Sequence, residues 1–144
     1  METVIGVTYP IPKKFVERFF LEGKTVFIKP GRVFKELKPG MKFVFYQSRE
    51  DTGCVGEAVI KNIIFEKNPL NFLKIYKEAV FLTEEEINDY ISNQKIWTGR
   101  GANKKDGEKR KKQWIAIELI DLKKYTQTIK PARFVSVGGR YIKG

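Results

Sequence analysis

Lys24 and Glu57 are the two residues whose surroundings in the sequence could support acid–base chemistry. Lys24 opens an expected strand and shares a face with Val26 and Ile28, so burial could lower the pKa of its amine toward that of a general base. Glu57 lies in an apolar run, where a carboxylate must pair with a cation, be protonated or line a cavity. The alternatives are a strand-end lysine with its amine in water and a carboxylate paired with a lysine, and for Glu57 we favour the pairing over catalysis.

A second group of residues could bind phosphate. The segment from Lys95 to Lys112 contains eight basic and two acidic residues, and so carries +6 of the formal net charge of +11. Such a segment attracts a nucleic acid because neutralising phosphates releases condensed counterions. The alternative is a solvated loop with one tryptophan in the core at each end. Trp97 and Trp114 flank the segment and could stack on unpaired bases. Its candidate phosphate-binding residues are Arg100, Lys104, Lys105, Lys109, Arg110, Lys111 and Lys112.

Further candidates for nucleic-acid contact lie at turns and strand ends. Arginine and lysine there could bind phosphate, and tyrosine could stack on a base. Gly138-Gly139 would also let the backbone approach a ligand closely, although a bulge in a strand explains it equally well. These candidates are Lys24, Lys29, Arg32, Tyr46, Arg49, Arg140 and Tyr141.

The residue types exclude several classes of site. The chain has no histidine, which excludes a Ser-His-Asp triad and a His-ligated zinc. Cys54 is the only cysteine, so an intrachain disulfide and a cysteine-cluster metal site are excluded as well. The triplet Glu84–Glu86 is better explained as the first turn of a helix than as a set of metal ligands. We therefore predict no metal and no cofactor, and we favour a binding protein over an enzyme.

Apolar periodicity and turn signals predict the elements that must position these residues. Strands are expected over 4–9, 24–29, 41–47, 54–65, 114–122 and 133–142, and helices over 12–22, 69–76 and 83–93. Gly23 should end the first helix, and Thr83 with Glu86 forms a capping box at the start of the third.

The order of the elements indicates an α+β fold built on a small mixed barrel. We expect one domain over residues 1–144, with a basic flexible loop at about 98–113. The expected core includes the aromatic residues Phe15, Phe19, Phe43, Phe45 and Phe65.

The segment Phe20-Leu-Glu-Gly-Lys-Thr-Val-Phe-Ile-Lys29 resembles the signature of the ASCH group in the PUA-like superfamily, in which a helix ends at glycine and Lys-Thr opens a strand. Four later segments resemble further strands of that fold: 38–46, 54–60, 114–118 and 139–142. Together the pieces look most like a small archaeal PUA-like family. The resemblance implies a PUA-like mixed β-pseudobarrel with helices at its rim. Many relatives bind RNA, often tRNA-like structures, and some hold a modified base in a pocket of the barrel.

One ASCH branch contains small amidohydrolases that act on acylated cytidine. Lys24 matches the lysine of that branch. However, Phe27 stands where a second hydroxyl-bearing residue is expected, and Lys29 stands where arginine is usual. These departures argue against hydrolysis.

Charge and resemblance together predict an RNA-binding module that recognises structured or single-stranded RNA, such as tRNA or a modified base, through the basic loop and a pocket at the barrel rim. One alternative is a small hydrolase that acts on a modified nucleoside with Lys24 and Glu57, and another is a scaffold for an acidic protein. No apolar run approaches the roughly 20 residues of a membrane-spanning helix, and the amino terminus lacks the pattern of a signal peptide. We therefore expect a cytoplasmic protein without membrane contact.

Overall fold

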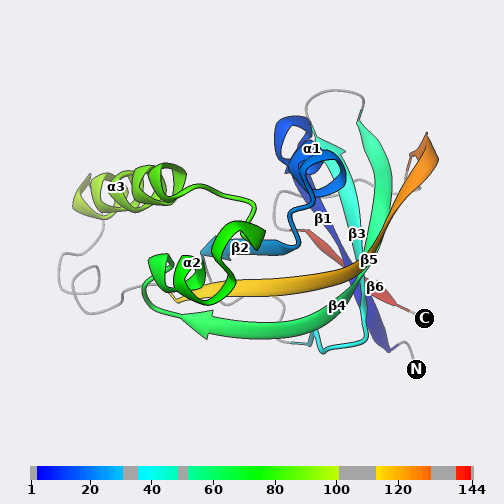
Figure 1. The fold of residues 1–144 in the computed structure, drawn as a ribbon, viewed down its shortest axis with the longest axis horizontal. Helices are drawn as coiled ribbons and strands as arrows, with labels where there is room; N and C mark the ends of the chain where they lie inside the picture. The colour runs from blue at the N-terminus through cyan, green and yellow to red at the C-terminus, as the bar shows by residue number, and fades with distance from the viewer. Residues whose placement is uncertain (1–2, 31–35, 49–51, 101–112, 131–138, 144) are drawn as a thin grey trace.

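Figure 1 shows a computed structural model that describes residues 3–30, 36–48, 52–100 (backbone alone for 93–100), 113–130 and 139–143. The strands and helices follow one another along the chain in the order β1 (Val4–Pro12), α1 (Lys13–Glu22), β2 (Val26–Pro30), β3 (Lys42–Ser48), β4 (Gly53–Glu66), α2 (Leu70–Tyr76), a 3₁₀ turn η1 (Lys77–Ala79), α3 (Glu84–Arg100), β5 (Trp114–Ile129) and β6 (Arg140–Lys143). The architecture is α+β, as predicted. Among the described residues, none of the helices combines the length and apolar character needed to cross a membrane.

All six described strands belong to one mixed sheet with the order β2-β5-β4-β3-β1-β6. β1 runs parallel to β3, and the other neighbouring strands are antiparallel. The long strands β4 and β5 pass through both halves of the sheet and curve strongly (Figure 1). Three register shifts interrupt their pairing, and because bulges increase the local twist and bend of a strand, they account for this curvature.

Helix α1 follows β1 directly and packs on the sheet through Val16 and Phe19. It ends as predicted at Gly23, whose φ of 75° is the left-handed conformation that glycine adopts without strain. The N–H of Gly23 donates to the carbonyl of Arg18, which satisfies one of the free carbonyls of the last turn.

The core is rich in aromatic rings that contact one another in series. Phe19 lies 5.1 Å from Phe45 and 5.3 Å from Phe81, measured between ring centroids. Phe27 stacks on Phe81 at 5.2 Å and contacts Phe43 at 5.5 Å. The predicted core positions Phe19, Phe43 and Phe45 are therefore confirmed.

Phe65 was expected in the core, and that expectation is wrong, since its side chain is 45% exposed. The pairing of β3 with β4 begins at Lys42 and Val59. Beyond Val59, β4 forms a ladder with β5 alone among the described strands, so Phe65 lies at a margin of the described sheet.

Strand β1 continues through Pro10 and Pro12, whereas the sequence predicted that it ends at Tyr9. The pairing of β1 with β6 extends only to Thr8, while its pairing with β3 continues to Pro12. Past Thr8 one side of β1 has no described strand neighbour. A proline there does not interrupt a central ladder.

Two other elements are longer than predicted. α3 continues through 98–100, which were assigned to the loop, and the remaining predicted loop residues, 101–112, lie outside the described part. β5 continues to Ile129 and passes through Asp121, which has a positive φ of 54° at a register shift in the pairing with β4. The last strand is described only over Arg140–Lys143, and 133–138 lie outside the described residues.

Candidate nucleic-acid interface

A cavity of about 660 Å³ opens between the end of β1, the start of α1, β2 and the first half of α3. Its volume falls within the range of ordinary small-molecule sites. The residues that give the cavity its aromatic character are Tyr9, Phe15, Phe27, Tyr46, Phe81, Tyr90 and Trp114. We call this space the aromatic cavity.

Strand β2 brings Lys29 to the wall of the aromatic cavity, and β1 brings Tyr9. The Lys29 ammonium lies 5.4 Å from the centroid of the Tyr9 ring, within reach of a cation–π interaction. Burial lowers the pKa of Lys29 below its ordinary value. Burial, together with Tyr90, raises the pKa of Tyr9 to about 12, so Tyr9 presents a neutral hydroxyl at physiological pH.

The rim of the aromatic cavity carries hydroxyl groups and a second cation. Tyr46 and Ser48 come from the end of β3, and Lys14 comes from the first turn of α1. A planar ring that enters the cavity would meet aromatic walls on which it can stack. An anionic group attached to that ring would lie near a lysine at the mouth of the cavity. The cavity therefore has the chemistry of a site for a flat, negatively charged ligand.

Trp114 forms part of this wall and is 2% exposed. Its ring lies 5.8 Å from Tyr90 in an edge-on arrangement. Trp114 therefore has the core position that was the alternative to a stacking surface, because the residue begins the buried run of β5. The side chain of Trp97 lies outside the described residues.

Lys24 lies outside the aromatic cavity, in a separate depression of about 530 Å³ that it lines together with Arg18 and Glu78. Its ammonium donates a hydrogen bond of 2.6 Å to the backbone carbonyl of Glu78. β2 begins at Val26, so the prediction that Lys24 opens the strand is wrong. The lysine joins the segment before β2 to the turn η1.

Glu57 lies on β4 and has partners of its own on β3 and β5. The Tyr125 hydroxyl donates a 2.8 Å hydrogen bond to its carboxylate, and the Lys42 ammonium lies 3.5 Å away. The hydrogen bond from Tyr125 is the main cause of the lowered pKa of Glu57, and Lys42 lowers it further. The structure therefore does not bring Lys24 and Glu57 together, and Glu57 has the lysine partner that the sequence favoured.

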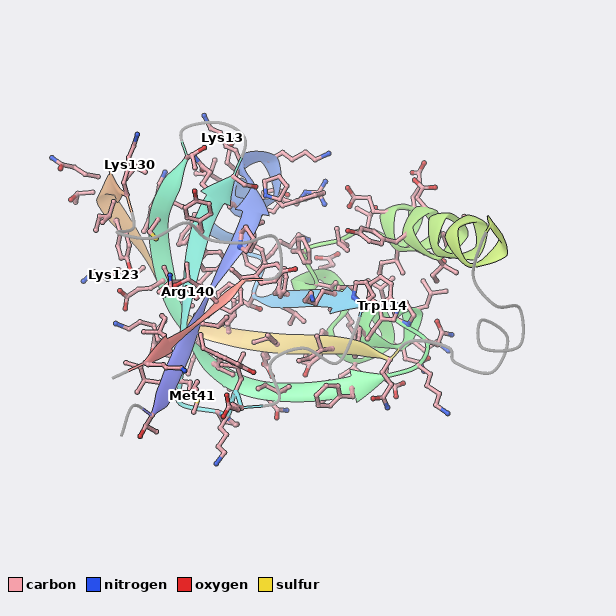
Figure 2. All side chains as sticks on the ribbon, turned by 180° about the vertical axis from the view of Figure 1, so that it is seen from behind. Lys13, Met41, Trp114, Lys123, Lys130 and Arg140 are labelled. Atoms are coloured by element: carbon pink, nitrogen blue, oxygen red, sulfur yellow. The ribbon has the colours of Figure 1, made fainter. Side chains whose placement is uncertain are left out.

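The remaining predicted contacts are only partly described. Lys29 and Tyr46 line the aromatic cavity together. Arg140 and Tyr141 lie on β6 at the opposite edge of the sheet from β2, and Figure 2 shows Arg140 well away from Trp114. The Tyr141 hydroxyl accepts a hydrogen bond of 3.3 Å from the backbone N–H of Glu36. The candidates outside the described side chains are Arg32, Arg49, Arg100, Lys104, Lys105, Lys109, Arg110, Lys111 and Lys112.

Sequence reasoning missed Tyr9, Lys14 and Tyr90 as parts of a site. No signal in the sequence links Tyr9 to Lys29, because the two strands that carry them are not neighbours in the sheet. Within the described part of the chain, no group of three or more acidic or cysteine side chains could hold a metal ion.

Comparison with known proteins supports the fold. Residues 4–144 match the family model described as "Domain of unknown function (DUF365)". A protein of Methanocaldococcus jannaschii, MJECS03, is 45% identical over 105 residues, which span 72% of this chain and 90% of that protein.

Three crystal structures are similar to this chain. The ASCH protein of Zymomonas mobilis superimposes with a TM-score of 0.62 at 15% identity over 87% of this chain and 73% of that one. A variant of the same protein with alanine in place of a serine has a TM-score of 0.65 at 15% identity, over 90% of this chain and 77% of that one. The hypothetical protein PH0355 has a TM-score of 0.52 at 16% identity, over 79% of this chain and 96% of that one. These likenesses confirm the expected ASCH-type, PUA-like pseudobarrel.

Proposed function

The chain belongs to the DUF365 family, and we propose that it is an RNA-binding module that takes one unpaired base into the aromatic cavity. The observation that carries this proposal is the half-buried Lys29 beside the Tyr9 ring in a cavity with aromatic walls. Bases of any kind have a face that can stack on such walls, so the cavity suits a nucleobase without requiring a particular sequence.

The charge of the chain supports a polyanionic partner. The formal net charge is +11, which raises the local concentration of a nucleic acid and accelerates its association. Burial disfavours the charged form of Lys29. A nucleotide phosphate at the mouth of the cavity would favour that form.

The ASCH-type fold supports the proposal only by analogy, since a fold hosts many functions. The separate surroundings of Lys24 and Glu57 favour binding over the nucleoside hydrolase considered above. The finer part of the proposal is that the RNA is structured or single-stranded, as in tRNA, with an unpaired and modified base as the group that enters the cavity.

The test is a binding titration with tRNA and with a single nucleotide. The affinity for tRNA should fall with salt, with a log–log slope of roughly −3 to −5 for about four to six phosphate contacts. Lys29→Gln should weaken the binding of the nucleotide by about ten- to a hundredfold, the usual range for a hydrogen bond to a charged group. Lys67→Gln is the control, because Lys67 is exposed and lines neither the aromatic cavity nor the depression beside Lys24. A flat salt dependence, or equal affinity of the two variants, would contradict the proposal.

A further inference from the structure

A second groove, of about 540 Å³, lies on the other side of α1 from the aromatic cavity. Three lysines and one acid line it: Lys13 and Glu17 come from α1, and Lys124 and Lys130 come from β5 and the residue that follows it. Figure 2 shows Lys13 and Lys130 at the same end of the molecule. We call this space the lysine groove.

One close contact brings the lysines of the helix and of the strand to the same groove. Lys124, Thr128 and Lys130 all line it, in a stretch where the pairing of β5 with β4 shifts register between Gly56 and Cys54. Gly56 pairs with Lys124 across the sheet, and a side chain at Gly56 would collide with the Phe20 ring. The missing side chain lets α1 lie against the sheet beside β5. The lysines of the helix and of the strand therefore border the same groove.

Thr52 lines both the lysine groove and the aromatic cavity. The two spaces therefore lie next to each other at Thr52, and an extended ligand that passes this residue can contact both. Among the described residues that line it, the groove has three lysines and one acid, and it adds the hydroxyls of Thr52 and Thr128, which are groups that commonly bind phosphate oxygens.

We propose that the lysine groove holds the sugar–phosphate backbone of a single-stranded RNA segment whose base enters the aromatic cavity. This inference rests on the proposed function and adds the path of the strand: from the cavity, past Thr52, along α1 and out between Lys124 and Lys130. An acidic peptide could satisfy the charge of the groove. An acidic peptide would not place a base in the adjacent aromatic cavity, and for this reason we favour RNA as the partner.

The experiment compares two double variants of the full chain that remove the same charge. Lys124→Gln with Lys130→Gln removes two exposed lysines of the groove. Lys67→Gln with Lys74→Gln removes two exposed lysines that line none of the three cavities described. The probes are a mononucleotide and a labelled single-stranded RNA of about ten nucleotides, within the range that one binding module covers. Equal melting temperatures would show that each variant is folded.

For the oligonucleotide, the groove variant should bind more weakly, and the slope of log affinity against log salt should become shallower by about 1.4 to 2, as expected for two lost phosphate contacts. Its affinity for the mononucleotide should not change. Glu17→Gln should have the opposite effect and tighten oligonucleotide binding about two- to fivefold, because it removes the acid of the groove.

The proposal would be overturned if the groove variant and the control variant lost equal affinity and kept equal slopes. It would also be overturned if polyglutamate bound as tightly as the RNA and depended on the same two lysines, since the groove would then be a protein-binding face. Failure of the proposed function is distinguishable, because it appears as a mononucleotide that does not bind or that is insensitive to Lys29→Gln.

Discussion

Arg18 donates two hydrogen bonds to the carboxylate of Glu86, at 2.6 Å and 2.9 Å, and a third to the backbone carbonyl of Phe81 at 2.8 Å. Its guanidinium also lies 4.9 Å from the centroid of the Phe15 ring. Phe15 and Phe81 belong to the wall of the aromatic cavity. The pair therefore fixes α1 against the start of α3, and it holds two walls of the cavity at a set distance.

Glu86→Gln should lower the free energy of unfolding by about 1 to 3 kcal/mol, because it removes a charge-assisted pair that joins two segments of the chain. Urea denaturation measures this change. Arg18→Lys should cost a similar amount, since lysine keeps the charge but cannot donate the paired hydrogen bonds. A Glu86→Gln variant as stable as the wild type would show that the pair contributes nothing to the fold.

The stability of the fold should depend on pH through the Glu86 carboxylate. The hydrogen bonds from Arg18, and those with Thr83, lower the pKa of Glu86 from 4.5 to about 2. Because the pKa of the folded state lies below that of the unfolded state, the stabilisation is complete above pH 4.5 and is lost as the pH falls toward 2. The difference in stability between wild type and Glu86→Gln should therefore shrink across this interval. A difference that stays constant with pH would contradict the assignment.

Gly56→Ala should destabilise the chain by about 1 to 3 kcal/mol, the usual cost of overpacking. The added carbon would collide with the Phe20 ring and would lie 2.8 Å from the carbonyl oxygen of Lys123. Thermal or urea unfolding tests this expectation. Phe20→Leu in the same chain should recover only part of the loss, because the contact with the backbone remains. Full recovery would show that the Phe20 ring alone sets the limit.

Binding of a nucleotide should weaken at alkaline pH through loss of the charge on Lys29. Burial lowers the pKa of this lysine from 10.5, so its charge is lost at a lower pH than that of an exposed lysine. The affinity should therefore be full at neutral pH and should begin to fall before pH 10.5 is reached. A titration of affinity against pH measures this, with Lys29→Arg as the variant that keeps its affinity at high pH. The same decline in both proteins would point to another group.

Local features of the fold were predictable because their causes are local. Thr83 and Glu86 form the capping box that their spacing indicates, with hydrogen bonds of 2.9 Å and 3.2 Å between backbone N–H groups and side chains. Gly23 ends α1 for a reason visible in its residue type alone. The ordered set of short motifs was also sufficient to identify the ASCH-type fold.

The aromatic cavity was not predictable, because it depends on how the sheet curls. Tyr9 and Lys29 lie on strands separated by three others in the sheet, and only the curvature of β4 and β5 brings them within a few ångströms. Nothing in the sequence shows that the chain passes through Asp121 with a positive φ and that β5 continues to Ile129, beyond the predicted end at 122. For the same reason Lys124 and Lys130 could not be assigned to one groove with Lys13.

The pairing of β6 with β1 has a consequence for how the chain folds. Thr8 of β1 pairs with Arg140, which lies far away in the sequence. Closure of this pair is a step of high contact order, and such steps are slow. Until the pair closes, one side of β1 presents unpaired backbone groups. Folding intermediates in which β6 has not yet docked therefore expose an edge on which aggregation can begin.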